Sequence, residues 1–182
     1  AMHEDENVRR VVKIVRSFGG NPESVVIGHR MRVPAVNAVL ANATMAHSAD
    51  YDDTHLAAII HPSSTVVPTA LAVGEALGAS GKEVLEACIA GYEVGIRVSL
   101  AAMRRLHERG FHPTSVVGVF SAAVTAAKLM GLDADGISNA MGIAGSMASG
   151  IMQGHREGVW LKPLHPAIAS HNGVLAAMMA RE

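Results

Sequence analysis

The sequence predicts an all-α protein, a multi-helix bundle, and three observations support that fold class. Apolar residues recur at the three- and four-residue spacing of helices through most of the 182 residues. Gly and Pro stand at the boundaries between these segments, where they end one helix or begin the next. Hydrophobic residues make up 49% of the chain and aromatic residues only 3%, so the core must consist of small and flexible side chains. Such side chains suit closely packed helices.

The first predicted helix covers 6–18 and is followed by a short extended segment. Its apolar face consists of Val8, Val11, Val12 and Val15. Gly19-Gly20-Asn21-Pro22 ends this helix. Residues 24–33 alternate in part and are rich in β-branched side chains, which favours an extended conformation.

The next three helices begin at recognisable start signals. Pro34 fits the first turn of a helix over 34–46, and Pro62 opens a helix over 62–77. Gly78 and Gly81 follow that helix and indicate a turn. Ser80 with Glu83 three residues later resembles a capping box, which predicts a long helix over 82–106.

Three helices are predicted in the remaining part of the chain. One covers 113–130 and is followed by Gly131 in a capping position. Another covers 133–149, and the small residues along one side of it predict a central position, because they let neighbouring backbones approach closely. The last covers 166–179.

Length and charge exclude several classes of protein. The 182 residues fit one helical domain over 1–182, in which Ala1-Met2 is compatible with a cloning remnant. The formal net charge of −1 and the lack of a long basic run argue against a nucleic-acid partner. No stretch approaches the roughly 18–20 uncharged apolar residues of a membrane span, so no membrane association is expected.

The single cysteine, Cys88, predicts a cytoplasmic protein without a disulfide framework. One thiol also excludes a self-contained iron–sulfur cluster held by three or four cysteines. Because Cys88 stands in an apolar helix, it is interpreted as an inert thiol.

Ionisable residues gather in the segment 46–54, Ala-His-Ser-Ala-Asp-Tyr-Asp-Asp-Thr. If the preceding helix continued through it, one face would carry His47, Asp50, Asp53 and Thr54. That face would offer a base, acids and a hydroxyl group to one substrate, whereas the alternative is a solvated acidic helix end. A metal site of His47, Asp50 and Asp53 lacks a supporting motif such as His-Glu-x-x-His, and no metal is predicted.

Two His-Pro steps share one form, His61-Pro62-Ser63 and His112-Pro113-Thr114. Proline biases the preceding residue away from helical geometry, so each imidazole is expected just before a helix N-terminus. The free N–H groups and the dipole there bind anions and favour a neutral histidine that acts as a base or a hydrogen-bond donor. The alternative is a helix start with an incidental histidine.

A third ionisable segment is Lys162-Pro163-Leu164-His165-Pro166. Lys162 is suited to hold a substrate carboxylate, although a lysine that merely extends to the surface is the alternative. The segment 78–82, Gly-Ala-Ser-Gly-Lys, lacks the spacing of a phosphate-binding loop and indicates a turn.

Together these segments resemble the MmgE/PrpD family over residues 25–179. The ordered matches are Val26-Ile27-Gly28, the segment 46–54, His61-Pro62-Ser63, Ala90-Gly91-Tyr92-Glu93-Val94, Gly110-Phe111-His112-Pro113-Thr114-Ser115, Gly142-Ile143-Ala144-Gly145-Ser146 and 162–166. Two departures are Ala167, where a glycine usually follows the last His-Pro, and the segment 53–62, which is unlike that of dedicated methylcitrate dehydratases.

The resemblance implies a helical domain that carries much of an active site, in a homodimer, with the family's α/β lid domain absent from this chain. The positions that match the family's catalytic pocket are Asp50, Thr54, His61, His112 and Lys162. Further residues expected to bind substrate are His47, Asp53, Ser63, Ser115 and His165. The chemistry implied is proton transfer beside a carboxylate without a metal or an organic cofactor.

The predicted function is therefore a lyase of small di- or tricarboxylic acids. His61 or His112 moves the proton, Asp50 and Thr54 orient the leaving group, and Lys162 binds carboxylate. A 2-methylcitrate dehydratase type of reaction ranks first, with family decarboxylation or epimerisation as alternatives. The competing hypothesis is a catalytically incomplete helical domain or subunit that needs a separate lid or partner chain.

Overall fold

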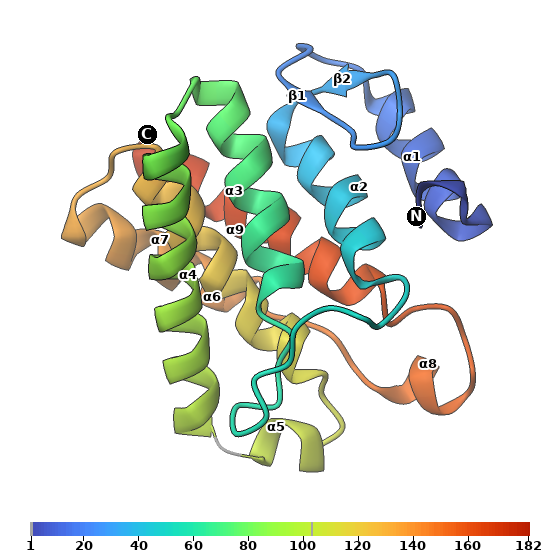
Figure 1. Ribbon diagram of the computed structural model, residues 1–182. Helices are drawn as coiled ribbons and strands as arrows, with labels where there is room; N and C mark the ends of the chain where they lie inside the picture. The colour runs from blue at the N-terminus through green and yellow to red at the C-terminus, as the bar shows by residue number, and fades with distance from the viewer. Residues whose placement is uncertain (1, 103) are drawn as a thin grey trace.

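The computed structural model describes residues 2–102 and 104–182 and confirms the all-α fold class, with helices packed against helices (Figure 1). A small antiparallel hairpin pairs Ser24 with Val33 and Val25 with Arg32. The elements in chain order are η1 (Met2–Glu4), α1 (Glu6–Phe18), β1 (Ser24–Val25), β2 (Arg32–Val33), α2 (Ala35–His47), α3 (Ser63–Leu77), α4 (Gly81–Ala102), α5 (Arg105–Glu108), α6 (Pro113–Leu129), α7 (Ala134–Ser146), α8 (Gln153–Arg156) and α9 (Leu164–Arg181).

Local signals placed most helix starts correctly. The four predicted valines of α1 are buried, and Asp5 caps this helix by accepting hydrogen bonds from the backbone N–H groups of Asn7 and Val8. The predicted capping box is also present, because Glu83 Oε2 accepts from the Ser80 N–H at 2.7 Å and the Glu83 N–H donates to Ser80 Oγ at 3.3 Å. The predicted single helix over 82–106 corresponds to α4 up to Ala102 and to the start of the separate short helix α5 at Arg105, with residue 103 outside the described residues.

The core lies along α6 and α9, and the expectation that the helix over 133–149 is central is wrong. In α6, 13 of the 17 residues are buried, whereas in α7 only Ala140 and Ala144 are. The small residues of α7 do not determine its depth, since depth depends on which neighbouring elements pack against a helix. Helix α6 is likewise rich in alanine, valine and small polar residues, and there they are buried on nearly every side.

The crossing of α6 and α9 depends on Gly173. A methyl group built on Gly173 would lie 2.7 Å from both the Val119 carbonyl oxygen and the Ala123 nitrogen. That separation is too short for a carbon atom, so only glycine permits the two backbones to approach this closely. The same two helices carry buried histidines at their N-terminal ends, and their spacing therefore positions the site described below.

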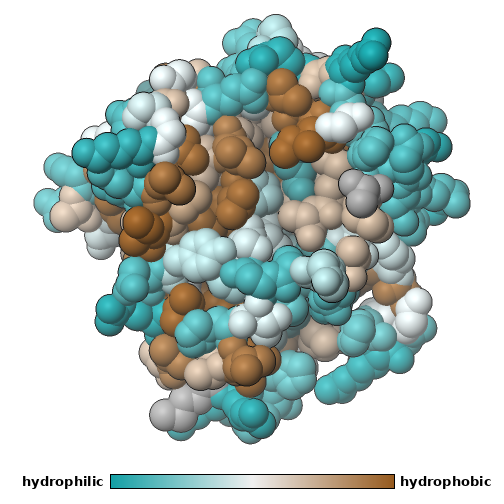
Figure 2. All heavy atoms as spheres, viewed as in Figure 1, coloured by the Kyte–Doolittle hydropathy of each residue, from teal (hydrophilic) through white to brown (hydrophobic). Residues whose placement is uncertain are grey.

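An exposed apolar surface covers the side of the molecule formed by α3 and α4 (Figure 2). The exposed large apolar residues of these two helices are Val67, Leu71, Leu77, Leu85, Ile89 and Leu100. In the described part of the chain, every helix is too short or too polar to cross a lipid bilayer. Cys88 lies half-buried on α4, where burial raises the pKa of its thiol, in agreement with an unreactive side chain.

Candidate active site

Four helix ends meet at one place in the fold. The C-terminal end of α2 carries His47, and the segments that lead into α3, α6 and α9 carry His61, His112 and Lys162. Figure 1 shows the chain between α2 and α3 passing beneath the lower ends of both helices. Proline follows each histidine of the two predicted His-Pro steps, and His112 has the extended conformation (φ −86°, ψ 106°) that proline imposes on the residue before it.

The segment after α2 does not continue the helix, which corrects one prediction. The helix ends at His47, and Asp50 has a left-handed backbone with φ of 52°. His47, Asp50, Asp53 and Thr54 therefore do not share one helix face. The turn at Asp50 sends its carboxylate toward Lys162, with which it forms an ion pair.

Asp52 is a site residue that the sequence analysis did not single out. Its carboxylate oxygens lie 2.8 and 3.0 Å from His47 Nδ1, and its side chain is only 6% exposed. An ionised carboxylate only accepts hydrogen bonds, so His47 Nδ1 carries a proton and Nε2 of the neutral ring has a free lone pair. His47 Nε2 is buried and has no hydrogen-bond partner, an arrangement that costs about 1–3 kcal/mol unless a ligand binds there.

His61 lies between the two carboxylates of Asp50 and Asp52. Its Nε2 is 3.8 Å from Asp50 Oδ1, and its Nδ1 is 3.8 Å from Asp52 Oδ1. Nδ1 also lies 3.1 Å from the Asp53 carbonyl oxygen and 3.3 Å from Thr54 Oγ1. The Nδ1 side of the ring thus faces oxygen atoms of Asp52, Asp53 and Thr54, and its Nε2 side faces Asp50.

His112 and His165 form a buried pair at the starts of α6 and α9. Their Nδ1 atoms are 3.1 Å apart, so one ring donates a hydrogen bond to the other. Burial lowers the pKa of His112 to about 2, and the neighbouring His165 adds to this effect. Burial likewise lowers the pKa of His165. His112 is therefore neutral as predicted, but burial rather than the helix N-terminus is the main cause.

The four histidines form a continuous row in the order His61, His47, His112 and His165, here called the histidine row. Successive ring centroids are 4.9, 5.9 and 5.1 Å apart. Ser115 supports its inner end by donating from Oγ to the His165 carbonyl oxygen at 3.1 Å. The row thus runs from a partly exposed imidazole beside two carboxylates to a buried pair.

Lys162 closes the outer side of the row. Its ammonium group pairs with Asp50, and this hydrogen bond holds the pKa of the Asp50 carboxyl below its usual range. The Lys162 side chain is 19% exposed, whereas that of Asp50 is 55% exposed. An incoming carboxylate can therefore reach the ammonium group from the solvent side and compete with Asp50 for it.

The side chains of Asp53 and Ser63, which were expected to bind substrate, point away from the row, although the Asp53 carbonyl oxygen contacts His61. Asp53 accepts hydrogen bonds from the Ser63 backbone N–H at 3.0 Å and from the Tyr92 hydroxyl at 3.0 Å. It therefore caps α3 and joins this helix to α4. Burial, together with the Asp53 carboxylate, raises the pKa of the Tyr92 hydroxyl. The remaining eight predicted residues lie in or beside the row.

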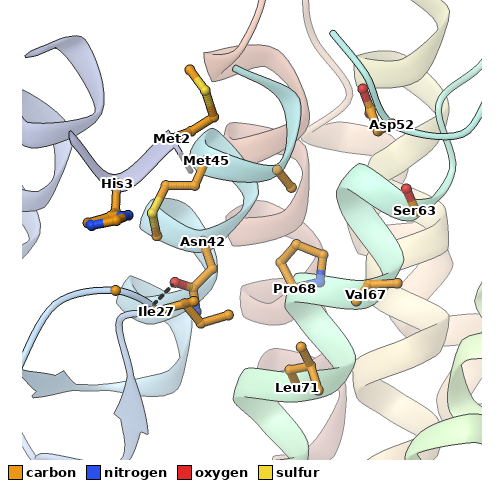
Figure 3. A pocket seen from close by; sticks show the side chains of 12 residues that line it. Met2, His3, Ile27, Asn42, Met45, Asp52, Ser63, Val67, Pro68 and Leu71 are labelled. Carbon is orange, nitrogen blue, oxygen red and sulfur yellow. Dashed lines mark hydrogen bonds between the residues drawn. The ribbon is translucent and has the colours of Figure 1, made fainter. Parts of the chain in front are cut away.

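A neighbouring pocket of about 390 Å³ lies between α2, α3 and the N-terminal segment (Figure 3). Asp52 and Ser63 line one end of it. Its other walls include the apolar side chains of Ile27, Met45, Val67, Pro68 and Leu71. A small polyanion would meet little positive charge there, so proton chemistry on such a substrate is better placed at the row than in this pocket.

The chain matches one protein-family model and several curated proteins. Residues 1–182 match the model of the MmgE/PrpD N-terminal domain. The chain is 34% identical over 165 residues to a cis-aconitate decarboxylase-like protein, oryM, of Aspergillus oryzae, which covers 86% of this chain and 34% of that protein. It is 31% identical over 177 residues to the cis-aconitate decarboxylase of Aspergillus terreus, covering 94% of this chain and 36% of that enzyme. The human cis-aconitate decarboxylase is 34% identical over 169 residues, which cover 90% of this chain and 34% of that enzyme. The chain thus spans about a third of the length of these curated relatives.

Proposed function

The chain belongs to the MmgE/PrpD family, and we propose that it forms one helical domain of a lyase acting on small di- or tricarboxylic acids. The observation that carries the proposal is the meeting of the Lys162–Asp50 pair with the histidine row. A carboxylate-binding cation and proton-transfer groups at one site are what elimination beside a carboxylate requires. We propose further that the reaction uses neither a metal nor an organic cofactor.

Lys162 binds a substrate carboxylate in this proposal. An anion at the ammonium group replaces the Asp50 carboxylate as its partner. On a hydroxy acid such as 2-methylcitrate, the freed Asp50 then accepts a hydrogen bond from the hydroxyl group that leaves, whereas cis-aconitate has no hydroxyl group and lacks this contact. Thr54 lies on the same side, within 3.3 Å of His61 Nδ1, and orients the leaving group together with Asp50. Substrate binding and the release of Asp50 are thereby coupled.

His61 is the group that transfers the proton. Its ring is 20% exposed and lies 3.8 Å from the carboxylates of Asp50 and Asp52, at the end of the row that substrate can reach, so it is the histidine placed to move a proton. His112 acts differently, because its buried ring stays neutral and donates or accepts only a hydrogen bond. His165 and Ser115 hold His112 in place from the inner side.

The relatives favour decarboxylation as the reaction. Each relative named above is called a cis-aconitate decarboxylase or is said to resemble one. We therefore rank loss of CO2 from a cis-aconitate-like acid above dehydration of a 2-methylcitrate-like acid, which sequence motifs alone placed first. Both reactions form or quench negative charge on a carbon next to a carboxylate, so proton transfer by His61 and carboxylate binding by Lys162 serve either, whereas orientation of a hydroxyl group by Asp50 and Thr54 belongs to dehydration.

A second candidate is a helical domain that binds the acid but turns it over only beneath a lid or a partner chain. The exposure of the site favours it, because Asp50 is 55% exposed and the neighbouring Tyr51 and Leu56 are 94% and 84% exposed. The apolar surface on α3 and α4 is suited to a covering domain or to the second subunit of a homodimer. A cytoplasmic location accords with the single cysteine.

The test is proton NMR of this chain with cis-aconitate, 2-methylcitrate and citrate in deuterated water. Deuterium incorporation, a decarboxylated product or a new alkene supports the lyase and identifies its reaction. Line broadening of the acid without turnover supports the second candidate, provided that Lys162→Met abolishes the broadening and His107→Gln, on the exposed part of α5, does not. A folded chain that shows neither binding nor turnover overturns both.

A further inference from the structure

We propose that His47, His61 and Asp50 bind a divalent transition-metal ion such as Zn²⁺, with Asp52 orienting His47. One ligand atom from each of His47, Asp50, Asp52 and His61 lies within 4.8 Å of the others. The proposal concerns binding by this chain and is tested without turnover. It therefore stands or falls separately from the lyase reaction proposed above.

Hydrogen bonds fix the proton positions on both imidazoles. His47 Nδ1 donates to the Asp52 carboxylate, and His61 Nδ1 faces the Asp53 carbonyl oxygen at 3.1 Å, a group that only accepts. In the neutral rings, both Nε2 atoms consequently have a free lone pair. These atoms lie 3.9 and 3.8 Å from the same carboxylate oxygen, Asp50 Oδ1.

Three acceptor atoms, the Nε2 atoms of His47 and His61 and Asp50 Oδ1, thus lie close together, and one cation bound among them would serve as the partner of all three. A tetrahedral zinc ion with ligands at about 2.0–2.2 Å holds its donor atoms roughly 3.4 Å apart, so the observed separations need to contract by about half an ångström. The buried His47 Nε2 has no partner within the protein, which is the observation expected of a preformed ligand. Asp52 behind His47 matches the carboxylate–histidine–zinc arrangement that orients metal ligands.

Lys162 is the competitor of the metal ion, because its ammonium group already pairs with Asp50. A metal ion at the site must displace this ammonium group, which the 55% exposure of the Asp50 side chain allows. Since the ion would also engage the Nε2 lone pairs of His47 and His61, it would inhibit proton transfer rather than assist it. Imidazole and carboxylate together favour Zn²⁺, Cu²⁺ or Ni²⁺ over Mg²⁺ and Ca²⁺.

The experiment is calorimetric titration of this chain with Zn²⁺, together with absorption spectra of the Co²⁺-loaded chain. We expect one ion per chain, visible cobalt bands of a site with nitrogen and oxygen ligands, and no saturable binding of Mg²⁺. His47→Gln and His61→Gln should each weaken Zn²⁺ binding by more than about a hundredfold. Asp52→Asn should weaken it by about 10- to 100-fold, the usual effect of removing an orienting carboxylate.

Two kinds of control separate this site from incidental histidine binding. His29→Gln should leave the affinity unchanged, although His29 Nε2 is likewise buried without a partner, and so should His165→Gln at the inner end of the row. Lys162→Met should strengthen Zn²⁺ binding by about tenfold, because it removes the competing positive charge. Asp50→Asn alters an exposed side chain, so it tests the ligand set even if the His47 variant fails to fold.

Three results would overturn the proposal. The first is no saturable Zn²⁺ binding by the folded chain. The second is unchanged affinity in both His61→Gln and Asp50→Asn. The third is weaker binding in Lys162→Met, since that outcome would mean that the ion does not compete with the ammonium group for Asp50.

Discussion

The two His-Pro steps begin with the same local sequence and end in opposite environments. His61 and His112 both precede a proline and a hydroxyl residue, and both stand at the start of a buried helix. The side chain of His61 is 20% exposed and faces two carboxylates. His112 is buried, and its hydrogen-bonding neighbour is another imidazole. Proline and the helix start therefore determine where each ring lies, whereas the residues packed around it determine its surroundings, which are carboxylates for His61 and a second imidazole for His112.

The two steps are also joined directly. The backbone N–H of His61 donates a hydrogen bond to Thr114 Oγ1 at 3.1 Å, and Thr114 belongs to the second step. The start of α6 thus holds the entry to α3 in place. One step supplies the proton-transfer group of the proposed reaction, and the other supplies a neutral ring and an anchor for the first.

The largest expected effect is that of His61→Gln on turnover. Glutamine keeps a polar side chain but cannot carry the proton, so we expect kcat to fall by about 10³- to 10⁴-fold. The lyase assay by NMR measures this, with His107→Gln as the control. Retention of a tenth or more of the activity would remove His61 from the proton-transfer step.

His112→Ala should lower turnover by at least about a hundredfold without unfolding the protein. Because His112 is neutral over the working pH range, the apparent pKa of the pH–rate profile should stay unchanged in this variant. His61→Gln should change the shape of the profile instead, because it removes the proposed proton-transfer group. If His112→Ala shifted the profile and His61→Gln did not, the roles assigned to the two histidines would be reversed.

Thr114→Val tests the link between the two steps. Valine matches threonine in shape but leaves the His61 N–H without its acceptor, so we expect a loss of about 1–3 kcal/mol in the free energy of unfolding. Denaturant titration measures the change. Thr69→Val is the matched control, because Thr69 Oγ1 donates to a carbonyl oxygen of its own helix, and its loss should cost less. Equal losses in the two variants would argue against a special role of the link.

The most gradual expected effect is a change in the pH dependence of stability. The folded-state pKa of His112, about 2, lies below its usual value near 6.5, so below that value the unfolded chain binds a proton that the folded chain does not. Stability is therefore complete above pH 6.5 and falls with acidification, by at most about 1.4 kcal/mol per pH unit for this group. His112→Gln should make the slope shallower, and His107→Gln should not. Identical slopes in all three proteins would refute the burial argument.

Most of the fold was predictable because its signals are local. The Ser80–Glu83 capping box and the prolines at the starts of α3 and α6 act within one helical turn. The position of α7 was not predictable from its small residues, since depth depends on which neighbours pack against it. The sequence motifs likewise name all four members of the histidine row as candidate site residues, and the structure places their rings side by side.

Asp52 was missed because a helical period was applied to the segment after His47. A helix groups residues three or four apart, which selected Asp50 and Asp53 together. In the structure the helix ends at His47, and the side chains after it point alternately to two sides. The carboxylates of Asp50 and Asp52 face the row, whereas that of Asp53 faces α3 and α4. The two-residue alternation of non-helical chain was a signal that could have identified Asp52. The left-handed backbone at Asp50 carries no comparable mark in the sequence.

Substitutions of Gly173 are expected to disturb the candidate active site, although this residue takes no part in its chemistry. This residue lies two helical turns from His165 and bears no functional group, yet it sets how closely α9 approaches α6. A single added methyl group there would act as a spacer between the two helices whose first turns hold His165 and His112. The geometry of the buried histidine pair therefore depends on a residue outside the candidate site. Variants at position 173 should be assayed together with variants of the candidate site in any saturation library.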